Sequence, residues 1–415
     1  MLSNNYMTNT YTGSSISLGL KISTFAVYVL ILFSQVSYAQ IQSTDYHIIR
    51  NSLGNSYIKF SKKKKAKVAF LGGSITYNPG WRDSTSAYIQ SKFPDTHFEF
   101  IPAGIPSMGS TPGAFRLERD ILSKGKIDLL FVEAAVNDPT NGRSSTEQIR
   151  AMEGIIRHAR RENPKMDIIT MYFVDPDKME IYNAGMVPEV ITNHEKVAKH
   201  YQVSSINLAK EVTDRINAVE FTWEDDFKNL HPSPFGQIIY YNSIRSFLGN
   251  AWYPSLKTNV KSTRYSTPAK LDEYCYDHGK LLSIDQAESI HGWQVINNWK
   301  PNENEGTRAG YVNVPMLCAD KPGEEIVLNF RARVIGISVA AGPDAGIIEY
   351  SIDGGAFKTL DIFTKWSSQL HLPWYYALES ELPYEKHSLR IRISENKNPE
   401  SKGNACRIKQ FFVNE

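Results

Sequence analysis

Three polar residues between positions 70 and 235 have the types that ester hydrolysis needs. Ser74 follows two glycines directly after a short apolar run, and Asn137 follows a second apolar run further along. His231 lies in the proline-rich segment His231-Pro232-Ser233-Pro234. A serine hydroxyl acts as a nucleophile when an imidazole takes its proton, and a side-chain amide can donate to a developing oxyanion. The three residues together indicate acyl transfer from an ester.

A fourth candidate lies between the serine and the asparagine. Residues 103–111 form a turn that contains Gly104 and Gly109, just after a predicted strand. A glycine-rich turn of this kind can direct a backbone N–H into a site. Such a backbone N–H could donate to an oxyanion together with the side-chain amide of Asn137.

Alternating strands and helices must position these residues. The predicted strands are Val68–Leu71, His97–Ile101, Ile127–Ala135, Ile168–Val174 and Val203–Leu208. The predicted helices are Ser84–Phe93, Ala114–Ser123, Thr146–Asn163, Val187–His200 and Pro234–Leu248. This alternation predicts a parallel sheet with helices on both faces. Ligands of such sheets bind outside the carboxyl ends of the strands, where the candidate residues lie.

With these motifs in order, the sequence resembles the SGNH (GDSL-like) hydrolase superfamily from about Lys67 to Leu248. Gly73-Ser74 stands at the first block, Gly109 at the second, Asn137-Asp138 at the third and His231 at the last. The resemblance implies a flavodoxin-like, doubly wound parallel sheet and hydrolysis of esters. It implies Ser74 as nucleophile, His231 as general base, and an oxyanion hole formed by the backbone N–H groups of Ser74 and Gly109 and the side chain of Asn137. Asp138 is expected to support its turn, and His194 and His200 are expected to lie on the surface.

The acid of the last block is the main departure from the family pattern. Lys228 occupies the position of the family's aspartate, three residues before His231, and Asn229 follows it. Asp225 and Asp226 lie further upstream. We predict Asp226 as the third catalytic residue. The alternative is a Ser-His dyad whose imidazole is oriented by Asn229, a backbone carbonyl or water.

The sequence changes character near Trp252. Long helical periodicity stops, and short runs such as Glu325–Phe330, Val334–Ala340, Gly346–Ile352 and Leu389–Ile393 predict strands. Regularly spaced short strands are typical of an all-β sandwich. We therefore predict a signal peptide over 1–39, a hydrolase domain with an N-terminal arm over 40–253 and a β-sandwich over 269–415. The aromatic residues of this sandwich are expected mainly in its core.

The first 39 residues predict export. Lys21 is their only charged residue, Phe25–Phe33 is apolar, and Ser37-Tyr38-Ala39 has the small-x-small pattern of a cleavage site. The apolar run is shorter than the roughly 20 residues of a membrane-spanning helix, so we predict no membrane span after its removal. An exported protein is expected in the periplasm or outside the cell.

Charge and cysteine content exclude several classes of partner and site. The 415 residues carry a formal net charge of +2, so we predict no nucleic-acid partner. The three cysteines, Cys275, Cys318 and Cys406, have no metal-site spacing, and we predict neither metal nor cofactor. One pair could form a disulfide in an exported protein.

These arguments predict an acylated carbohydrate as the substrate. Export and an appended β-domain favour a large extracellular polymer, and the enzyme would remove O-acetyl groups from a plant or algal polysaccharide. A short-acyl lipase or thioesterase is the first alternative. The second is a non-catalytic carbohydrate-binding protein on a hydrolase fold, which the altered acid position supports and the intact Ser74, Asn137 and His231 oppose.

Overall fold

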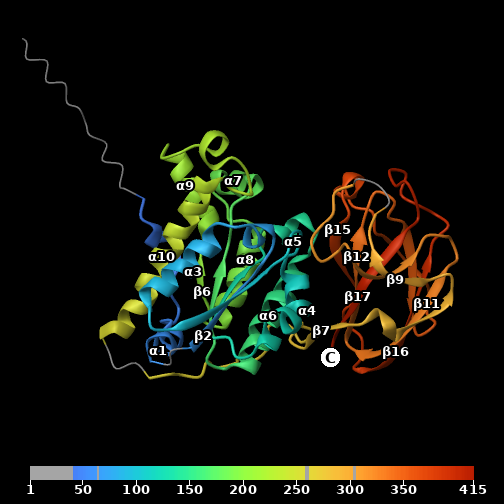
Figure 1. The fold of residues 1–415 in the computed structure, drawn as a ribbon, viewed down its shortest axis with the longest axis horizontal. Helices are drawn as coiled ribbons and strands as arrows, with labels where there is room; N and C mark the ends of the chain where they lie inside the picture. The colour runs from blue at the N-terminus through green and yellow to red at the C-terminus, as the bar shows by residue number, and fades with distance from the viewer. Residues whose placement is uncertain (1–40, 63–64, 258–260, 302–304) are drawn as a thin grey trace, which may run out of the picture. The chain divides into compact units, whose positions relative to one another are not determined.

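The computed structural model describes residues 41–62, 65–257, 261–301 and 305–415, and these residues form one compact unit from Ile41 to Glu415. The predicted signal peptide, 1–39, lies outside the described residues. No helix in the described ranges has the length and apolarity to cross a membrane. The two parts of the chain with different sequence character have different architectures (Figure 1).

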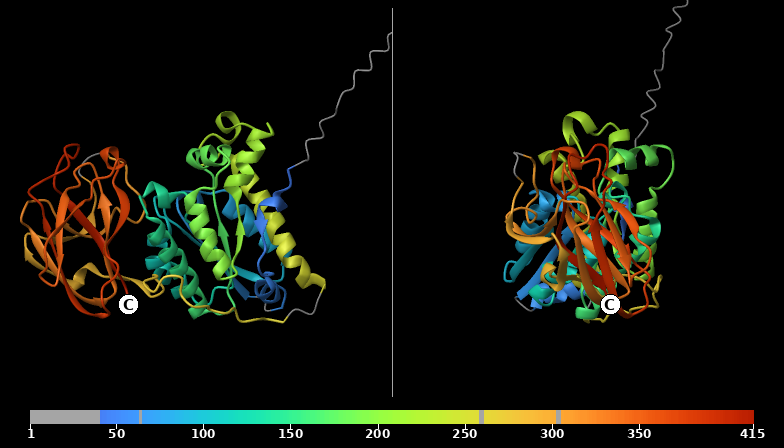
Figure 2. Two further views of the ribbon diagram at one scale, coloured as in Figure 1. Left: turned by 180° about the vertical axis from the view of Figure 1, so that it is seen from behind. Right: turned by 90° about the vertical axis from the view of Figure 1, so that its right-hand side faces the viewer.

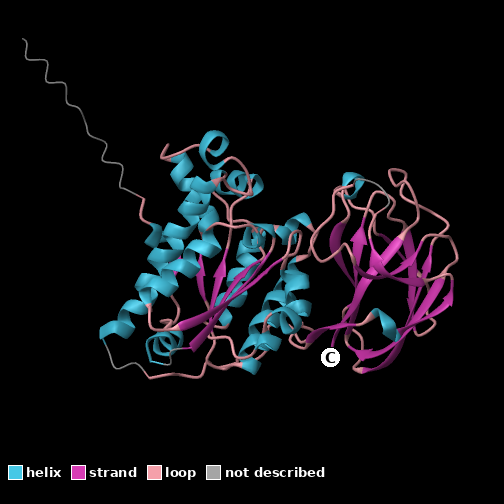
Figure 3. Cartoon of the chain, in the orientation of Figure 1, coloured by secondary structure: helices cyan, strands magenta, loops and turns pink. Residues whose placement is uncertain are grey.

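The first part is a six-stranded sheet with helices on both faces (Figure 3). Its order is β1 (His47–Ile48), β6 (Ser204–Ile206), β5 (Asp167–Met171), β4 (Leu129–Glu133), β2 (Lys65–Gly72) and β3 (His97–Gly104). All neighbours are parallel except β1, which pairs antiparallel with β6. The order β3-β2-β4-β5-β6 is the flavodoxin-like 2-1-3-4-5 arrangement. The predicted fold class is confirmed.

Alternation along β2 divides the core into two layers. Val68 and Phe70 belong to one hydrophobic cluster, whereas Ala69 and Leu71 belong to another, because successive strand residues point to opposite faces. The first layer is covered by α1 (Gly54–Lys62), α3 (Trp81–Lys92), α7 (Pro176–Asn183), α9 (Leu208–Asn217) and α10 (Pro234–Lys257). The second is covered by α4 (Ser110–Asp120), α6 (Ser145–Glu162) and α8 (Glu189–His200).

Several element boundaries differ from the predictions. The helices α1, α7 and α9 lie in segments where none was predicted. The N-cap of α6 is Ser144, whose hydroxyl accepts from the Glu147 N–H at 3.2 Å, so α6 begins at Ser145, one residue before the predicted start. The last helix, α10, continues through Pro254 to Lys257, beyond the predicted end.

The second part is an antiparallel β-sandwich, as predicted. One sheet has the order β15 (Leu372–Glu379), β12 (Val334–Ala341), β17 (Cys406–Asn414), β10 (Val314–Ala319) and β9 (Gln294–Trp299), with β7 (Gly279–Leu282) also paired to β17. The other has the order β14 (Lys358–Asp361), β13 (Ile347–Ile352), β16 (Glu385–Ile393), β11 (Glu325–Ala332) and β8 (Ala287–His291). Their inner faces share a single apolar cluster. Figure 2 shows the strands of this part from two further directions.

Apolar contacts join the sandwich to the hydrolase sheet. The rings of Phe115 in α4 and Phe412 in β17 lie 4.3 Å apart, and both belong to the cluster that covers the second face of the sheet. Arg143 donates to the Tyr375 carbonyl at 2.6 Å from the same side. The predicted domain boundaries stay predictions, but these contacts show that the two parts share buried surface.

The cysteines and aromatic residues of the second part are mostly buried. Cys275, Cys318 and Cys406 are all buried and free, so the disulfide considered from the sequence is not formed. Burial raises the pKa of the Cys318 thiol to about 11, which keeps it protonated and unreactive. Trp374 and Tyr375 lie in the core as predicted, whereas Trp366 is exposed.

Candidate active site

Strand order decides where a site can form on this sheet. The chain leaves β2 first toward β3 on one side and later returns to β4 on the other side, so β2 and β4 flank the topological switch point. Ligands of doubly wound sheets bind at this crevice, outside the carboxyl ends of the strands. Ser74 follows β2 as the first residue of α2 (Ser74–Tyr77), and Asn137 follows β4 as the first residue of α5 (Asn137–Thr140).

The structure brings Ser74 and His231 together across 157 residues of chain. Nε2 of His231 lies 2.7 Å from Oγ of Ser74, which is hydrogen-bond distance. The histidine comes from the loop before α10, and that loop is pinned by the Asn229 side chain, which accepts from the His231 backbone N–H at 2.8 Å. This is the nucleophile-base geometry that the sequence predicted.

His231 is set up to be neutral. Partial burial lowers the pKa of its imidazole below the usual value, and the positive charge of Arg308 lowers that pKa further. Arg308 belongs to the segment between β9 and β10 of the sandwich. A base must be unprotonated to act, so both effects extend the pH range in which His231 can accept a proton.

The structure does not bring Asp226 into a hydrogen bond with His231. One carboxylate oxygen of Asp226 accepts from both the backbone N–H and the hydroxyl of Thr222, at 2.8 and 3.1 Å. These bonds close the turn η3 (Trp223–Phe227), and Phe227 is buried beneath it. Lys228, at the family's acid position, has a positive φ of 81° where the turn ends. Among the described residues, no carboxylate hydrogen-bonds to His231.

The predicted oxyanion donors converge on the same turn. A Cβ added to Gly73 would lie 2.1 Å from Nδ2 of Asn137, so the amide reaches the backbone of the nucleophile turn only because residue 73 has no side chain. Asn137 donates to the Met108 carbonyl at 3.2 Å. Within the described residues, the backbone N–H groups of Ser74 and Gly109 have no acceptor, so both are available to a ligand.

A buried pair fixes the turn that carries Gly109. Asp138 accepts from the backbone N–H and the hydroxyl of Ser110, both at 2.7 Å, and lies 2.9 Å from Nε2 of His194. Asp138 therefore supports its turn, as predicted. The prediction that His194 lies on the surface is wrong, because only 1% of it is exposed. Its helical neighbours at i±3 and i±4 are all apolar, which is the signal that could have identified it as buried: Val190, Ile191, Val197 and Ala198.

Sequence reasoning also missed Glu133, the last residue of β4. Its carboxylate accepts from the Val136 N–H at 3.3 Å and from the Gly73 N–H, and only 2% of the residue is exposed. Burial raises the pKa of this carboxyl to about 7, against the opposing effects of those hydrogen bonds and of Lys178. Glu133 ties the nucleophile turn to the Asn137 turn. A lone acid at the end of an otherwise apolar buried strand was the signal for it.

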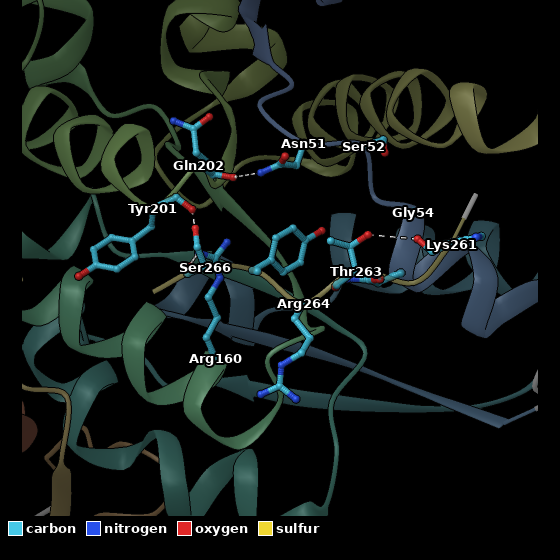
Figure 4. A pocket seen from close by; sticks show the side chains of 12 residues that line it. Asn51, Ser52, Gly54, Arg160, Tyr201, Gln202, Lys261, Thr263, Arg264 and Ser266 are labelled. Carbon is cyan, nitrogen blue, oxygen red and sulfur yellow. Dashed lines mark hydrogen bonds between the residues drawn. The ribbon is translucent and has the colours of Figure 1, made fainter. Parts of the chain in front are cut away.

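A separate cavity lies at the other edge of the sheet. It has a volume of about 360 Å³ and is lined in part by Arg160 of α6 and by Tyr201 and Gln202, which follow α8 (Figure 4). These residues precede β5 and β6, so the cavity lies near the amino ends of the strands. None of the predicted site residues lines it. It is not part of the serine-histidine site.

The hydrogen bonds of Asp226 predict a small role in catalysis. Replacement Asp226→Asn should lower kcat by less than about tenfold, because its carboxylate binds Thr222 and not His231. Neutralising a carboxylate that orients the histidine of a triad would instead lower kcat roughly 10⁴-fold. Steady-state hydrolysis of p-nitrophenyl acetate measures this, with Asp225→Asn as the neighbouring control. A loss of several orders of magnitude in Asp226→Asn alone would restore Asp226 as the third catalytic residue.

The position of Arg308 predicts the acidic limb of the pH-rate profile. Activity should fall as the pH decreases through the pKa of His231, which lies below its usual value. Arg308→Gln removes one cause of that lowering, so the limb should move to higher pH, and only part of the way because burial remains. An unchanged limb in a profile of kcat/KM would show that Arg308 does not act on His231.

Glu133 predicts a pH-dependent stability. Because its folded pKa is about 7, above the usual 4.5, the folded state binds the extra proton between these values and loses stability as the pH rises through that window. The full effect is on the order of 3 kcal/mol. Glu133→Gln keeps the shape and has no such proton, so thermal unfolding from pH 5 to pH 8 should show a smaller decrease in Tm than in the parent. An equal decrease in Tm with pH in Glu133→Gln and in the parent would show that Glu133 does not titrate in this range.

The comparisons with known proteins agree with this fold. Residues 70–238 match the model of the GDSL-like Lipase/Acylhydrolase family. Two solved structures of a two-domain esterase active on acetylated mannans, one co-crystallised with mannopentaose, share the fold across both parts of the chain. Each has a TM-score of 0.73, with 20% and 19% identity, and covers 90% of this chain and 98% of that chain. No curated protein matches this sequence. Residues 70–238 therefore resemble the domain of the GDSL-like lipase/acylhydrolase family, and this match supports assignment of the chain as an ester-hydrolysing serine hydrolase.

Proposed function

We propose that this protein removes O-acetyl groups from a polysaccharide, with Ser74 as the nucleophile and His231 as the general base. The observation that carries the proposal is the 2.7 Å distance between Ser74 Oγ and His231 Nε2 at the switch point of a GDSL-like domain. The two-domain esterase of the same fold acts on acetylated mannans, which supports an acetylated carbohydrate as the substrate class.

The reaction begins when Ser74 Oγ attacks the ester carbonyl and its proton moves to His231 Nε2. His231 then gives the proton to the departing sugar hydroxyl, and an acetyl-serine remains. A water molecule, deprotonated by the same imidazole, hydrolyses the acetyl-serine and releases acetate. Both tetrahedral intermediates carry a negative oxygen, which the N–H groups of Ser74 and Gly109 and the Asn137 amide stabilise.

Without a hydrogen-bonded carboxylate, the protonated form of His231 is less stabilised than in a catalytic triad. The imidazolium that forms during attack has no negative partner among the described residues, and Arg308 adds positive charge nearby. The imidazole is instead placed by its loop, through the bond from the His231 N–H to Asn229. We propose that the site works as a Ser-His dyad, in which water or substrate orients the His231 imidazole through its Nδ1 atom.

Export supports a polymeric substrate. The predicted signal peptide over 1–39 would place the enzyme in the periplasm or outside the cell, where it meets polysaccharides. The alternative, a short-acyl lipase or thioesterase, is compatible with the same catalytic pair and differs only in the acyl group and the leaving group. Relative rates on acetylated polymers and on longer acyl esters separate the two.

The test is release of acetate from an acetylated mannan and an acetylated xylan by the purified protein, compared with hydrolysis of p-nitrophenyl butyrate and octanoate. The proposal predicts acetate release from at least one polymer and loss of roughly 10⁴-fold or more in Ser74→Ala, since nothing else supplies the nucleophile. Circular dichroism should show that Ser74→Ala remains folded, because Ser74 lies at a partly exposed turn. Turnover by Ser74→Ala at the parent rate, or activity on the acyl esters alone, would contradict the proposal.

A further inference from the structure

A second pocket lies in the β-sandwich, apart from the catalytic pair. It has a volume of about 870 Å³, within the usual range for ligand sites, and we call it the β9 pocket. The strand β9 supplies Gln294, Ile296, Asn298 and Trp299, and further residues come from the segment after it, the end of β10 and residues near Asp344. Neither Ser74 nor His231 lines it.

An irregularity in β9 directs its side chains into the pocket. The pairing with β10 shifts between Met316, opposite Ile296, and Val314, opposite Trp299, so β9 contains one extra residue there. Such a bulge changes where the following side chains point. Asn298 and Trp299 consequently both line the pocket, whereas their neighbour Asn297 does not.

The lining offers unused hydrogen-bonding groups. Gln294 and Asn298 are exposed, and within the described part of the chain their side chains have no hydrogen-bond partner. Each amide has donors and an acceptor, so it can bind a ligand hydroxyl as donor or acceptor. Ile296 lies between them with 38% of its surface exposed and adds an apolar contact. Amides beside an apolar surface suit a sugar ring, which has hydroxyls at its rim and C–H groups on its faces.

The charges of the pocket favour a neutral ligand. Four basic residues and four acidic residues line it: Lys300, Lys321, Lys402, Arg407, Asp320, Asp344, Glu305 and Glu324. Several are already engaged, since Arg407 pairs with Asp344, and Glu324 accepts from the backbone N–H groups of Asp320 and Lys321 at 2.9 and 3.0 Å. A balanced, internally paired lining gives little attraction for an anion.

One short segment connects the β9 pocket with the catalytic pair. Glu305 lines the pocket, and Arg308, three residues later, is close enough to His231 to act on its charge state. Three residues of extended chain span at most about 11 Å between Cα atoms. Gly306 fixes the segment, because its N–H donates to the Gln369 carbonyl at 3.3 Å and its carbonyl accepts from the His371 N–H at 2.8 Å. This short connection places the β9 pocket on the same side of the sandwich as the residue that acts on His231.

We propose that the β9 pocket is a distal subsite that binds neutral sugar residues of the same polysaccharide whose acetyl ester lies at Ser74. The inference rests on the proposed function and adds a second binding site to it. The amides of Gln294 and Asn298 hold sugar hydroxyls, and the pocket increases the affinity for long substrates without taking part in the chemistry.

The test uses Asn298→Ala with Asn297→Ala as a matched control, because the two asparagines are adjacent and exposed and only Asn298 lines the pocket. Loss of one amide contact should raise KM for acetylated mannan roughly 3- to 10-fold, with kcat unchanged. Hydrolysis of p-nitrophenyl acetate, which is too small to reach the pocket, should equal that of the parent. The control should match the parent on both substrates.

Binding without turnover separates this inference from the proposed function. In a Ser74→Ala background, mannopentaose should bind in calorimetry, and Asn298→Ala should weaken that binding whereas Asn297→Ala should not. Equal behaviour of the two variants on the polymer and in calorimetry would overturn the inference. Weakened binding with an unchanged KM for the polymer would overturn the claim that one chain occupies both sites. A parent protein that releases no acetate from any polymer would instead refute the proposed function.

Discussion

The close approach of three backbone turns at the carboxyl edge of the sheet is the constraint on which the site depends. Gly73 and Gly109 make it possible, because a Cβ at either position would lie 2.1 Å from the side chain of Asn137 or Asp138. Real Cβ atoms do not come so close to a neighbouring atom, so any larger residue at position 73 or 109 would displace the side chain of Asn137 or Asp138. The predicted oxyanion donors and the candidate nucleophile are therefore brought together by the close approach that these two glycines allow.

Buried polar groups then hold the turns in place. Asp138 binds Ser110 and His194 in the interior, and Glu133 accepts from the Gly73 N–H in the nucleophile turn and from the Val136 N–H in the Asn137 turn. Buried groups of this kind are costly unless they are paired, and each of these is paired with a part of the site. His231, in contrast, is exposed, and its position depends on the loop between η3 and α10. Rigid support therefore lies beneath the oxyanion donors, and the base lies on the more exposed side.

The sequence predicted the parts of this arrangement that depend on local pattern. Ser74, Gly109, Asn137 and His231 were each found because they follow a strand or precede a helix in a recognisable order, and strand order then brings them together. The roles of Glu133, His194 and Arg308 depend on contacts between segments far apart in the chain, which no local pattern contains. Only the apolar spacing around His194 and the position of Glu133 in a buried strand gave a signal.

Asp226 and Pro254 show where local reasoning was misleading. Asp226 has the right chemistry at nearly the right distance along the chain, but its turn satisfies the carboxylate with Thr222. Pro254 lies beyond the predicted end of the last helix at Leu248, yet α10 passes through it to Lys257. For Asp226 the competing partner lies four residues away and is visible only once the backbone geometry is known.

The most direct measurement of the central claim is covalent trapping of the nucleophile. Intact-mass and peptide mass spectrometry after treatment with diethyl p-nitrophenyl phosphate reports which side chain attacks an activated ester-like centre. The account predicts a single diethylphosphoryl adduct on Ser74, formed in step with the loss of esterase activity. Loss of activity with the adduct on another residue, or full activity with Ser74 modified, would contradict it.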